Sequence, residues 1–247
     1  MSLDTCPWMG RAGYGGEARY ALDIRAYHDQ VVAPAIASFH RLLDETRAKD
    51  SAEPQGGWVF LVSDQEDLLK STIEAFCLAL HSHFERRLRK YLTDDTPGIP
   101  SKNLASANWE VLQKAFEGKR GMALTAFDSF AWLDLLNTVG NVCRHGDGNA
   151  SGNLHEQHPS LWPAYPDLSG VFDDLPVALK PKGPPGVDAA TVPEAWLRRF
   201  TDAIAWFWDD IEYLNIRNIQ SKAPAAVRRM DELKSTWPRR IKTIIYQ

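Results

Sequence analysis

The sequence predicts an all-α protein, built as a bundle of four to six helices. Apolar residues recur at spacings of three and four in several long segments, which places them along one face of a helix. No segment alternates apolar and polar residues as a half-buried strand does, and no fixed-period repeat is present. We therefore expect a helical bundle with one long irregular insertion before its last long helix.

Residues 1–62 are expected to form an N-terminal helical extension. Its first residues are rich in glycine, and helical periodicity then runs from about Tyr20 to Lys49. Pro34 lies inside this segment and predicts a kink or a restart, because proline removes a backbone donor. The short apolar run at 58–62 fits either a strand or the lead into the next helix, and its periodicity does not decide between them.

Residues 63–219 are expected to form the bundle itself. Ser63 and Glu66 have the spacing of a capping box, and the apolar positions that follow predict a helix over residues 64–92. This helix ends in a basic run, which suits the negative end of the helix dipole.

Two further helices are predicted before the insertion. The first covers 103–117 and is broken at Gly118, and the second covers 127–145, where Gly146 is suited to the C-terminal cap. Glycine, proline, asparagine and aspartate occur throughout residues 147–192, which we expect to be largely irregular. Pro193 then suits the first turn of the last long helix.

Residues 220–247 form a basic C-terminal tail. From residue 221 onward, seven Lys or Arg stand against two acids, with Trp237 and Tyr246 between them. Basic side chains near aromatic ones can follow a nucleic-acid backbone and stack its bases. This makes the tail a candidate RNA-binding segment, with the binding residues Arg228, Arg229, Arg239 and Arg240. The competing interpretation is a surface helix that packs Trp237 inward.

Composition limits the class of protein. The 247 residues carry a net charge of −4, so no overall positive field indicates nucleic-acid or membrane binding. The three cysteines lie far apart, without a CxxC pair, which argues against a zinc site and fits a reducing cytoplasm. No apolar run is long enough for a membrane span, and the first residues do not resemble a signal peptide. We expect a cytoplasmic protein with no cofactor, no metal site and no membrane association.

The segment 134–148 carries the polar residues of most interest. On a helix, its polar side chains fall within roughly 100° of one another, and they are Asp134, Asn137, Asn141, Arg144 and His145. An imidazole can transfer a proton, and a guanidinium can stabilise charge that develops on a phosphate. The competing interpretation is the solvated face of an amphipathic helix.

The other histidines carry less information. His81 and His83 are two residues apart on a predicted helix, so they cannot share a face, and we expect polar flank positions for both.

The end of this predicted helix resembles the HEPN superfamily (higher eukaryotes and prokaryotes nucleotide-binding). The signature of that superfamily is Arg-Asn-x-x-x-His at the end of a helix, often followed by glycine. Asn141, His145 and Gly146 match it, whereas its arginine falls on Gly140, and Arg144 precedes the histidine. The resemblance spans about residues 64–219.

The resemblance implies an α-helical dimer that acts on RNA. In many such proteins, two signature motifs meet at the dimer interface and form a metal-independent endoribonuclease used as a toxin or in defence against phage. It implies His145 as general acid and base, Arg144 as the phosphate contact and Asn141 as the orienting residue. Asp134 and Asn137 are expected to support them and to contribute to binding.

The alternative is a non-catalytic module for protein–protein interaction or nucleotide binding. Its docking element is expected to be the tryptophan-rich helix over 193–214. Trp196, Trp206 and Trp208 do not fit one helix face, so at least one should lie away from the core.

Overall fold

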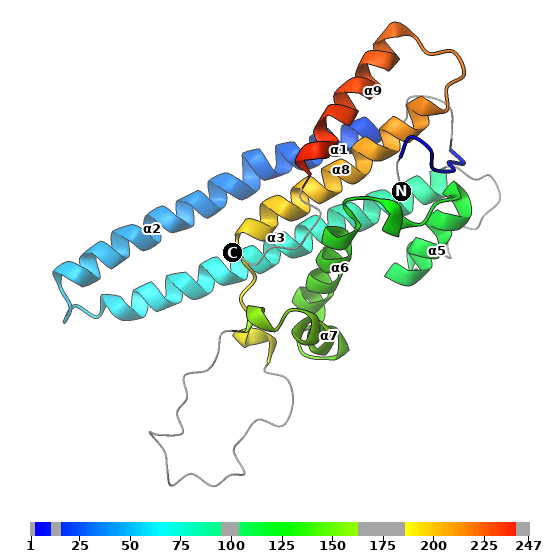
Figure 1. The fold of residues 1–247 in the computed structure, drawn as a ribbon. Coiled ribbons are helices and arrows are strands. Elements are labelled where there is room, and N and C mark those ends of the chain that lie inside the picture. Colours follow the sequence, from blue (N-terminus) through cyan, green and yellow to red (C-terminus); the bar gives the residue numbers. More distant parts are fainter. Residues whose placement is uncertain (1–2, 11–15, 95–103, 163–185, 241–247) are drawn as a thin grey trace.

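The structure is a computed structural model, which describes residues 3–10, 16–94, 104–162 and 186–240. All regular structure in these ranges is helical, which confirms the predicted all-α bundle (Figure 1). The α-helices are α1 (Glu17–Tyr27), α2 (Ala33–Ala52), α3 (Trp58–Asp94), α5 (Trp109–Arg120), α6 (Phe130–His145), α7 (Asn149–Gln157), α8 (Ala195–Arg217) and α9 (Pro224–Thr236). None of these helices is both long enough and apolar enough to cross a bilayer.

A long antiparallel hairpin of α2 and α3 dominates the shape (Figure 1). The π-helical turn His28–Val32 joins α1 to α2 without a break, so the predicted restart is only a change of winding. Pro34 is the second residue of α2, just after this turn, and it donates no backbone hydrogen bond. A wider turn just before a proline relieves the clash of its ring with the preceding helical turn.

Helix α8 forms the centre of the bundle. Almost every side chain from Ala203 to Ile216 is buried, as expected for a helix that is covered on all sides. Phe207 makes edge-on or tilted ring contacts with Phe84, Phe116 and Phe127, which come from three other parts of the chain. The core is therefore aromatic and gathers around this one helix.

Several predicted boundaries are wrong. Ser63 lies within α3 and caps nothing, because the apolar run at 58–62 is the first turn of that helix. Gly118 also lies within a helix, since α5 runs on to Arg120 and ends at Gly121, whose φ is +70°. Asn108 caps the start of α5 by accepting a hydrogen bond from the backbone of Val111 at 2.9 Å.

Helix α7 lies in a segment that was expected to be irregular, and helix α9 lies in the basic tail, for which a surface helix was the competing interpretation. Helix α7 begins four residues after α6 ends and lies in the segment expected to be irregular, of which residues 163–185 lie outside the described ranges. Helix α9 forms from the basic tail and lies against α8 (Figure 1).

Candidate functional site at the end of α6

Helix α6 has the two faces that its sequence predicts. Its apolar side chains Trp132, Leu135, Leu136 and Val139 are buried in the core. The helix ends at Gly146, where φ is +68°, and the backbone N–H of Gly146 donates to the carbonyl of Val142 at 2.8 Å. This positive φ suits glycine, and the helix end places Arg144 and His145 in the last turn.

The predicted polar stripe of α6 contacts neighbouring helices along part of its length. The indole N–H of Trp109 donates to Asp134 at 2.7 Å, so Asp134 holds the start of α5. Asn137 and Arg144 face α3 and contact His81 there. The stripe is therefore partly an interhelical polar seam and not only a solvated face.

His81 is the residue of this site whose role sequence analysis missed. It is only 2% exposed, and its ring lies between two residues of α6. His81 Nε2 is 3.4 Å from Asn137 Oδ1, and Arg144 Nη2 is 3.4 Å from His81 Nδ1. One neutral tautomer satisfies both contacts, with Nε2–H donating to the amide oxygen and Nδ1 accepting from the guanidinium.

Gly140 makes room for this arrangement. A Cβ atom at residue 140 would lie 2.5 Å from Cγ of His81 and 2.7 Å from its Cβ, closer than real Cβ contacts come. The position of the signature arginine is thus a point of close approach between α6 and α3, and the ring of His81 fills that space. A glycine in the middle of a helix is a signal of close approach, and it could have directed attention to this contact.

The electrostatic surroundings keep His81 neutral. Burial lowers the pKa of its imidazole, and the nearby charges of Arg144 and Arg89 lower it further, against the opposing effects of Glu85 and Asn137. Glu85 is itself paired with Arg89 at 2.9 Å. A neutral ring can accept from Arg144, which an imidazolium cannot do.

The thiols at the same helix crossing are unreactive. Cys77 of α3 is buried and Cys143 of α6 is half-buried. Burial raises the pKa of Cys77 well above its ordinary value and that of Cys143 to about 12. Both groups are therefore protonated thiols at neutral pH, and neither is an activated nucleophile.

The outer part of the site is open to solvent. Arg144 and His145 are exposed, and Asn141 is half-buried between their turn and the core. Asp147, just beyond Gly146, accepts a 2.7 Å hydrogen bond from the backbone of Val187 and so ties the chain before α8 to the end of α6. A cation and an imidazole are thus exposed at successive residues, and Arg144 contacts the buried His81.

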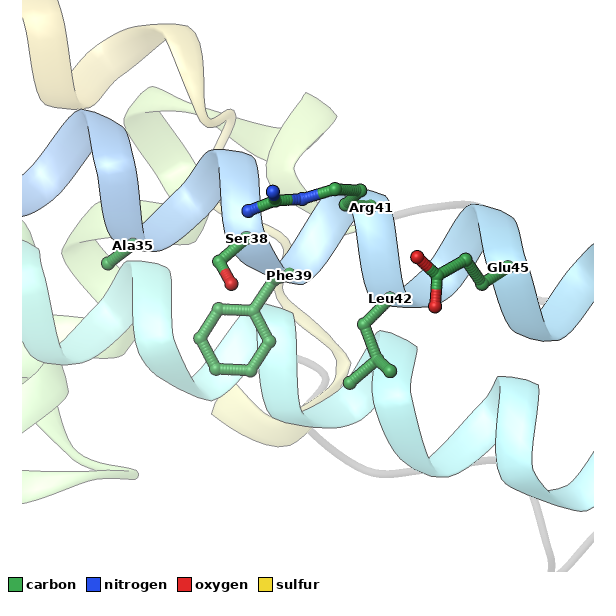
Figure 2. A pocket seen from close by; sticks show the side chains of 6 residues that line it. All are labelled: Ala35, Ser38, Phe39, Arg41, Leu42 and Glu45. Atoms are coloured by element: carbon green, nitrogen blue, oxygen red, sulfur yellow. The ribbon is translucent and has the colours of Figure 1, made fainter.

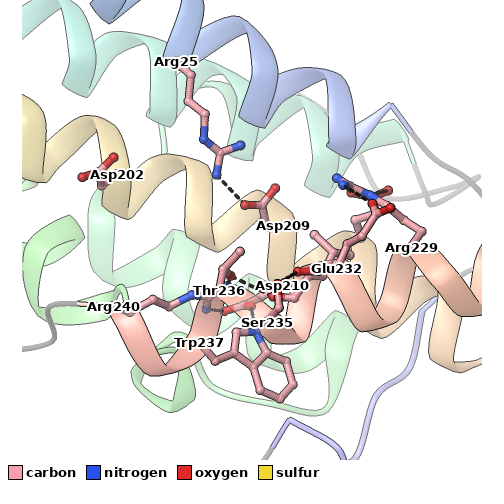
Figure 3. Close-up of polar contacts among 12 residues, drawn as sticks. Arg25, Asp202, Asp209, Asp210, Arg229, Glu232, Ser235, Thr236, Trp237 and Arg240 are labelled. Atoms are coloured by element: carbon pink, nitrogen blue, oxygen red, sulfur yellow. Dashed lines mark hydrogen bonds and ion pairs between the residues drawn. The ribbon is translucent and has the colours of Figure 1, made fainter.

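The four candidate arginines of the tail divide into two pairs. Arg229 reaches Glu212 of α8 through two contacts of 2.8 and 3.0 Å, and Arg240 pairs with Asp210 at 2.7 Å with both side chains fully buried (Figure 3). Arg228 and Arg239 are exposed. Only the second pair is presented to solvent as an RNA-binding surface requires.

The tryptophan-rich helix is not a docking surface as a whole. Trp196 and Trp208 are buried in the core, which contradicts their proposed use in docking a partner protein. Trp206 is half-buried, in line with the expectation that one of the three lies away from the core, and the guanidinium of Arg240 lies 5.8 Å from its ring.

Comparison with known proteins finds no matching family model, no matching curated protein and no matching solved structure.

Proposed function

We propose that the end of α6 binds the phosphodiester backbone of RNA and cleaves it, as a HEPN-like metal-independent endoribonuclease. The observation that supports this most is the chain of contacts from Asn137 through His81 to Arg144. These contacts hold the guanidinium of Arg144 on the side that faces α3. Its other side stays open to solvent, next in the chain to the exposed His145. Oriented donors next to an accessible imidazole are what phosphoryl-transfer chemistry needs.

In this proposal each residue has a distinct role. Arg144 contacts the phosphate and stabilises the charge that builds up on it, and His145 transfers protons. His81 and Asn137 are positioning residues, because they act through Arg144. Asn141 orients the two outer groups, and Asp134 supports the site by fixing the start of α5.

RNA supplies the nucleophile in the proposed reaction. His145 takes the proton of the 2′-hydroxyl as the 2′-oxygen attacks phosphorus, and the bond from phosphorus to the 5′-oxygen breaks. The imidazolium then returns the proton to the leaving 5′-oxygen, which leaves a 2′,3′-cyclic phosphate and a 5′-hydroxyl. The reaction balances with no co-reactant, so the assay is run with EDTA present.

The decisive experiment measures cleavage of total cellular RNA by the wild type, His145→Ala and Arg144→Ala. Wild type is expected to cleave, and each variant is expected to lose about a hundredfold or more of the rate. Arg19→Ala removes an exposed arginine at the start of α1 and serves as the matched control with unchanged activity. Absence of cleavage by the wild type in both monomeric and oligomeric fractions would contradict the proposal.

His81→Ala tests the positioning role separately. It is expected to lower the cleavage rate less than Arg144→Ala does, and to leave the rate of the double variant close to that of Arg144→Ala alone. Residues that act through one another show this non-additivity.

The biological setting in this proposal is a cytoplasmic toxin or a phage-defence enzyme. Expression of the wild type is then expected to arrest bacterial growth, and expression of His145→Ala is expected not to.

A second candidate is the non-catalytic interaction module. The observation that favours it is the set of exposed apolar side chains near the turn between α2 and α3, where Phe60 is 75% exposed. Intact RNA in the cleavage assay, together with retained RNA binding that Arg144→Ala weakens, would favour a binding role for the α6 end.

A further inference from the structure

Five of the ten large apolar side chains that are exposed in the described ranges lie on the outer half of the α2–α3 hairpin. Leu42 is 46% exposed and Leu68 is 52% exposed, and the large side chains Val59, Phe60 and Leu61 are exposed at the start of α3. Exposed apolar side chains that gather on one part of a protein mark a candidate interaction site.

Three of these side chains, Leu42, Leu61 and Leu68, fall on a heptad register of their helix. On α2 the spacing of four and three relates Val31, Ala35, Ser38, Leu42 and Glu45, and on α3 it relates Leu61, Gln65, Leu68, Thr72 and Ala75. Alternating spacings of four and three form a straight seam along a helix. Each helix of the hairpin therefore carries a second seam besides the one that packs it against the other.

The two outer seams lie on the same side of the hairpin. On each helix the outer seam precedes the buried seam by one residue, as Leu42 precedes the buried Leu43 on α2 and Thr72 precedes the buried Ile73 on α3. Because the helices are antiparallel, a shift of one residue in the same chain direction turns both seams toward the same side. We call this side the open face.

The opposite side of the hairpin is already occupied. His40 contacts Glu194 beside the start of α8 at 2.5 Å, and Lys70 donates to the carbonyl of Asp188. These two contacts hold the hairpin to the bundle and leave the open face uncovered by any described residue.

A groove of about 550 Å³ lies along α2 on the open face (Figure 2). Its lining combines small side chains with larger apolar ones and is Ala35, Ser38, Phe39, Arg41, Leu42 and Glu45. Small side chains allow a second helix to approach closely, and the groove leaves room for a large apolar side chain from that helix.

The groove carries one positive and one negative side chain, which can pair with their counterparts on a second copy. Arg41 and Glu45 are exposed one turn apart, on either side of Leu42, and neither pairs with another charge within the described ranges. If a second α2 lies antiparallel across the groove, each Arg41 meets Glu45 of the other copy. A surface whose charges match after a twofold rotation suits an isologous contact.

We propose that the open face is a self-association surface, on which the α2–α3 hairpin of a second copy packs with the two α2 helices antiparallel. Four helices then share one apolar interior, which a lone hairpin cannot enclose. The HEPN resemblance implies a dimer at the signature motif on α6, whereas this surface lies on the hairpin. The proposal does not rest on the RNA function.

Molar mass from light scattering across a dilution series tests the proposal. Wild type is expected to form dimers, and Leu42→Glu and Leu68→Glu are each expected to weaken the dimer by about tenfold or more, because each buries an unpaired charge. Val227→Glu on α9 and Val111→Glu on α5 introduce the same charge at side chains of similar exposure, 45% and 44%, and are expected to leave the dimer unchanged.

A charge exchange tests the register and the identity of the partner. Arg41→Glu and Glu45→Arg each place like charges opposite one another and are expected to weaken the dimer severalfold. The double variant R41E/E45R exchanges both charges and is expected to restore it, which happens only when the partner is a second copy in this register. Circular dichroism checks that each variant is folded.

Two results would overturn the proposal. One is a wild-type protein that stays monomeric up to its solubility limit. The other is a dimer that Leu42→Glu leaves intact or that the double variant fails to restore. Neither result bears on RNA cleavage, and a loss of cleavage by His145→Ala says nothing about this surface.

Discussion

Two groups of arginines in this protein have the same chemistry and opposite surroundings. On α8, the acids Asp209, Asp210 and Glu212 are buried and paired with Arg25, Arg240 and Arg229 (Figure 3). We call this group the α8 clasp. At the end of α6, Arg144 contacts only the neutral His81 among the described residues and is exposed.

The two groups differ in the residue that each arginine contacts, which is a buried carboxylate on α8 and the neutral imidazole of His81 at the end of α6. A buried carboxylate requires a counter-charge, because an unpaired charge in the core is very costly. The clasp arginines supply it and join α1, α9 and the residues just after α9 to α8. His81 requires no counter-charge, so the charge of Arg144 stays available to a ligand. The clasp is therefore expected to determine stability, and the α6 end to determine function.

The largest expected effect comes from breaking the clasp at its most buried pair. Arg240→Ala leaves Asp210 without its counter-charge in the core, and is expected to lower the free energy of unfolding by about 3–5 kcal/mol. Arg239→Ala removes its exposed neighbour and is expected to change it by less than about 0.5 kcal/mol. Urea denaturation measures both, and equal effects of the two variants would contradict the distinction.

Gly140→Ala is expected to have the next largest effect. The added Cβ overlaps the ring of His81, so the variant is expected to lose about 2 kcal/mol of stability through overpacking. Gly140→Arg, which would restore the signature arginine, is expected to be worse and not to raise activity.

A double-mutant cycle identifies the cause of that loss. His81→Gly removes both the ring and the Cβ that a Cβ at residue 140 would meet, so Gly140→Ala should cost much less in the His81→Gly background than in the wild type. An equal cost in both backgrounds would place the strain elsewhere in α6.

A smaller effect is expected at the outer pair of the clasp. Arg229 is one-third exposed, so water can partly replace it beside Glu212. Arg229→Ala is expected to cost about 1 kcal/mol, and Arg228→Ala close to nothing. Thermal unfolding of the two variants in parallel provides the measurement. A larger loss from Arg228→Ala would mean that the exposed arginines of α9 are also structural.

Sequence patterns located the helices whose apolar stripes are long. Ile73, Cys77, Leu80, Phe84 and Leu88 recur at spacings of three and four and are all buried, so α3 could be placed from such positions, although its first turn could not. Helix α7 has too few apolar residues to show such a stripe; Ser151 stabilises its start by bonding to the backbone of Gly148. A helix that is stabilised by local polar contacts of this kind shows no apolar periodicity from which it could be predicted.

The candidate site was predictable only on its own helix. The spacing within 134–145 brought Asn137, Arg144 and His145 to one side of α6, and Gly140 marked a close approach without saying to what. His81 lies 63 residues before Arg144, and no spacing rule relates them. Sequence likewise does not distinguish the four tail arginines from one another. Only the tertiary structure brings acids of α8 to Arg229 and Arg240.

The smallest expected effect is a difference in the sign of the pH dependence. Burial raises the pKa of Asp210 from 3.8 to about 6, so this group favours the native state at low pH, and its contribution is lost as the pH rises through about 6. Burial instead lowers the pKa of His81 from 6.5, so its contribution is present above pH 6.5 and is lost as the pH falls through the folded pKa. Where the two titration ranges overlap, the contributions of Asp210 and His81 have opposite signs. Asp210→Asn is expected to make the unfolding free energy rise more steeply with pH, and His81→Gln to make it rise less steeply. Each changes the slope by at most about 1.4 kcal/mol per pH unit, measured by urea denaturation from pH 5 to 8. Slopes that move in the same direction in both variants would mean that the clasp and the α6 end do not differ in the way their charges are held.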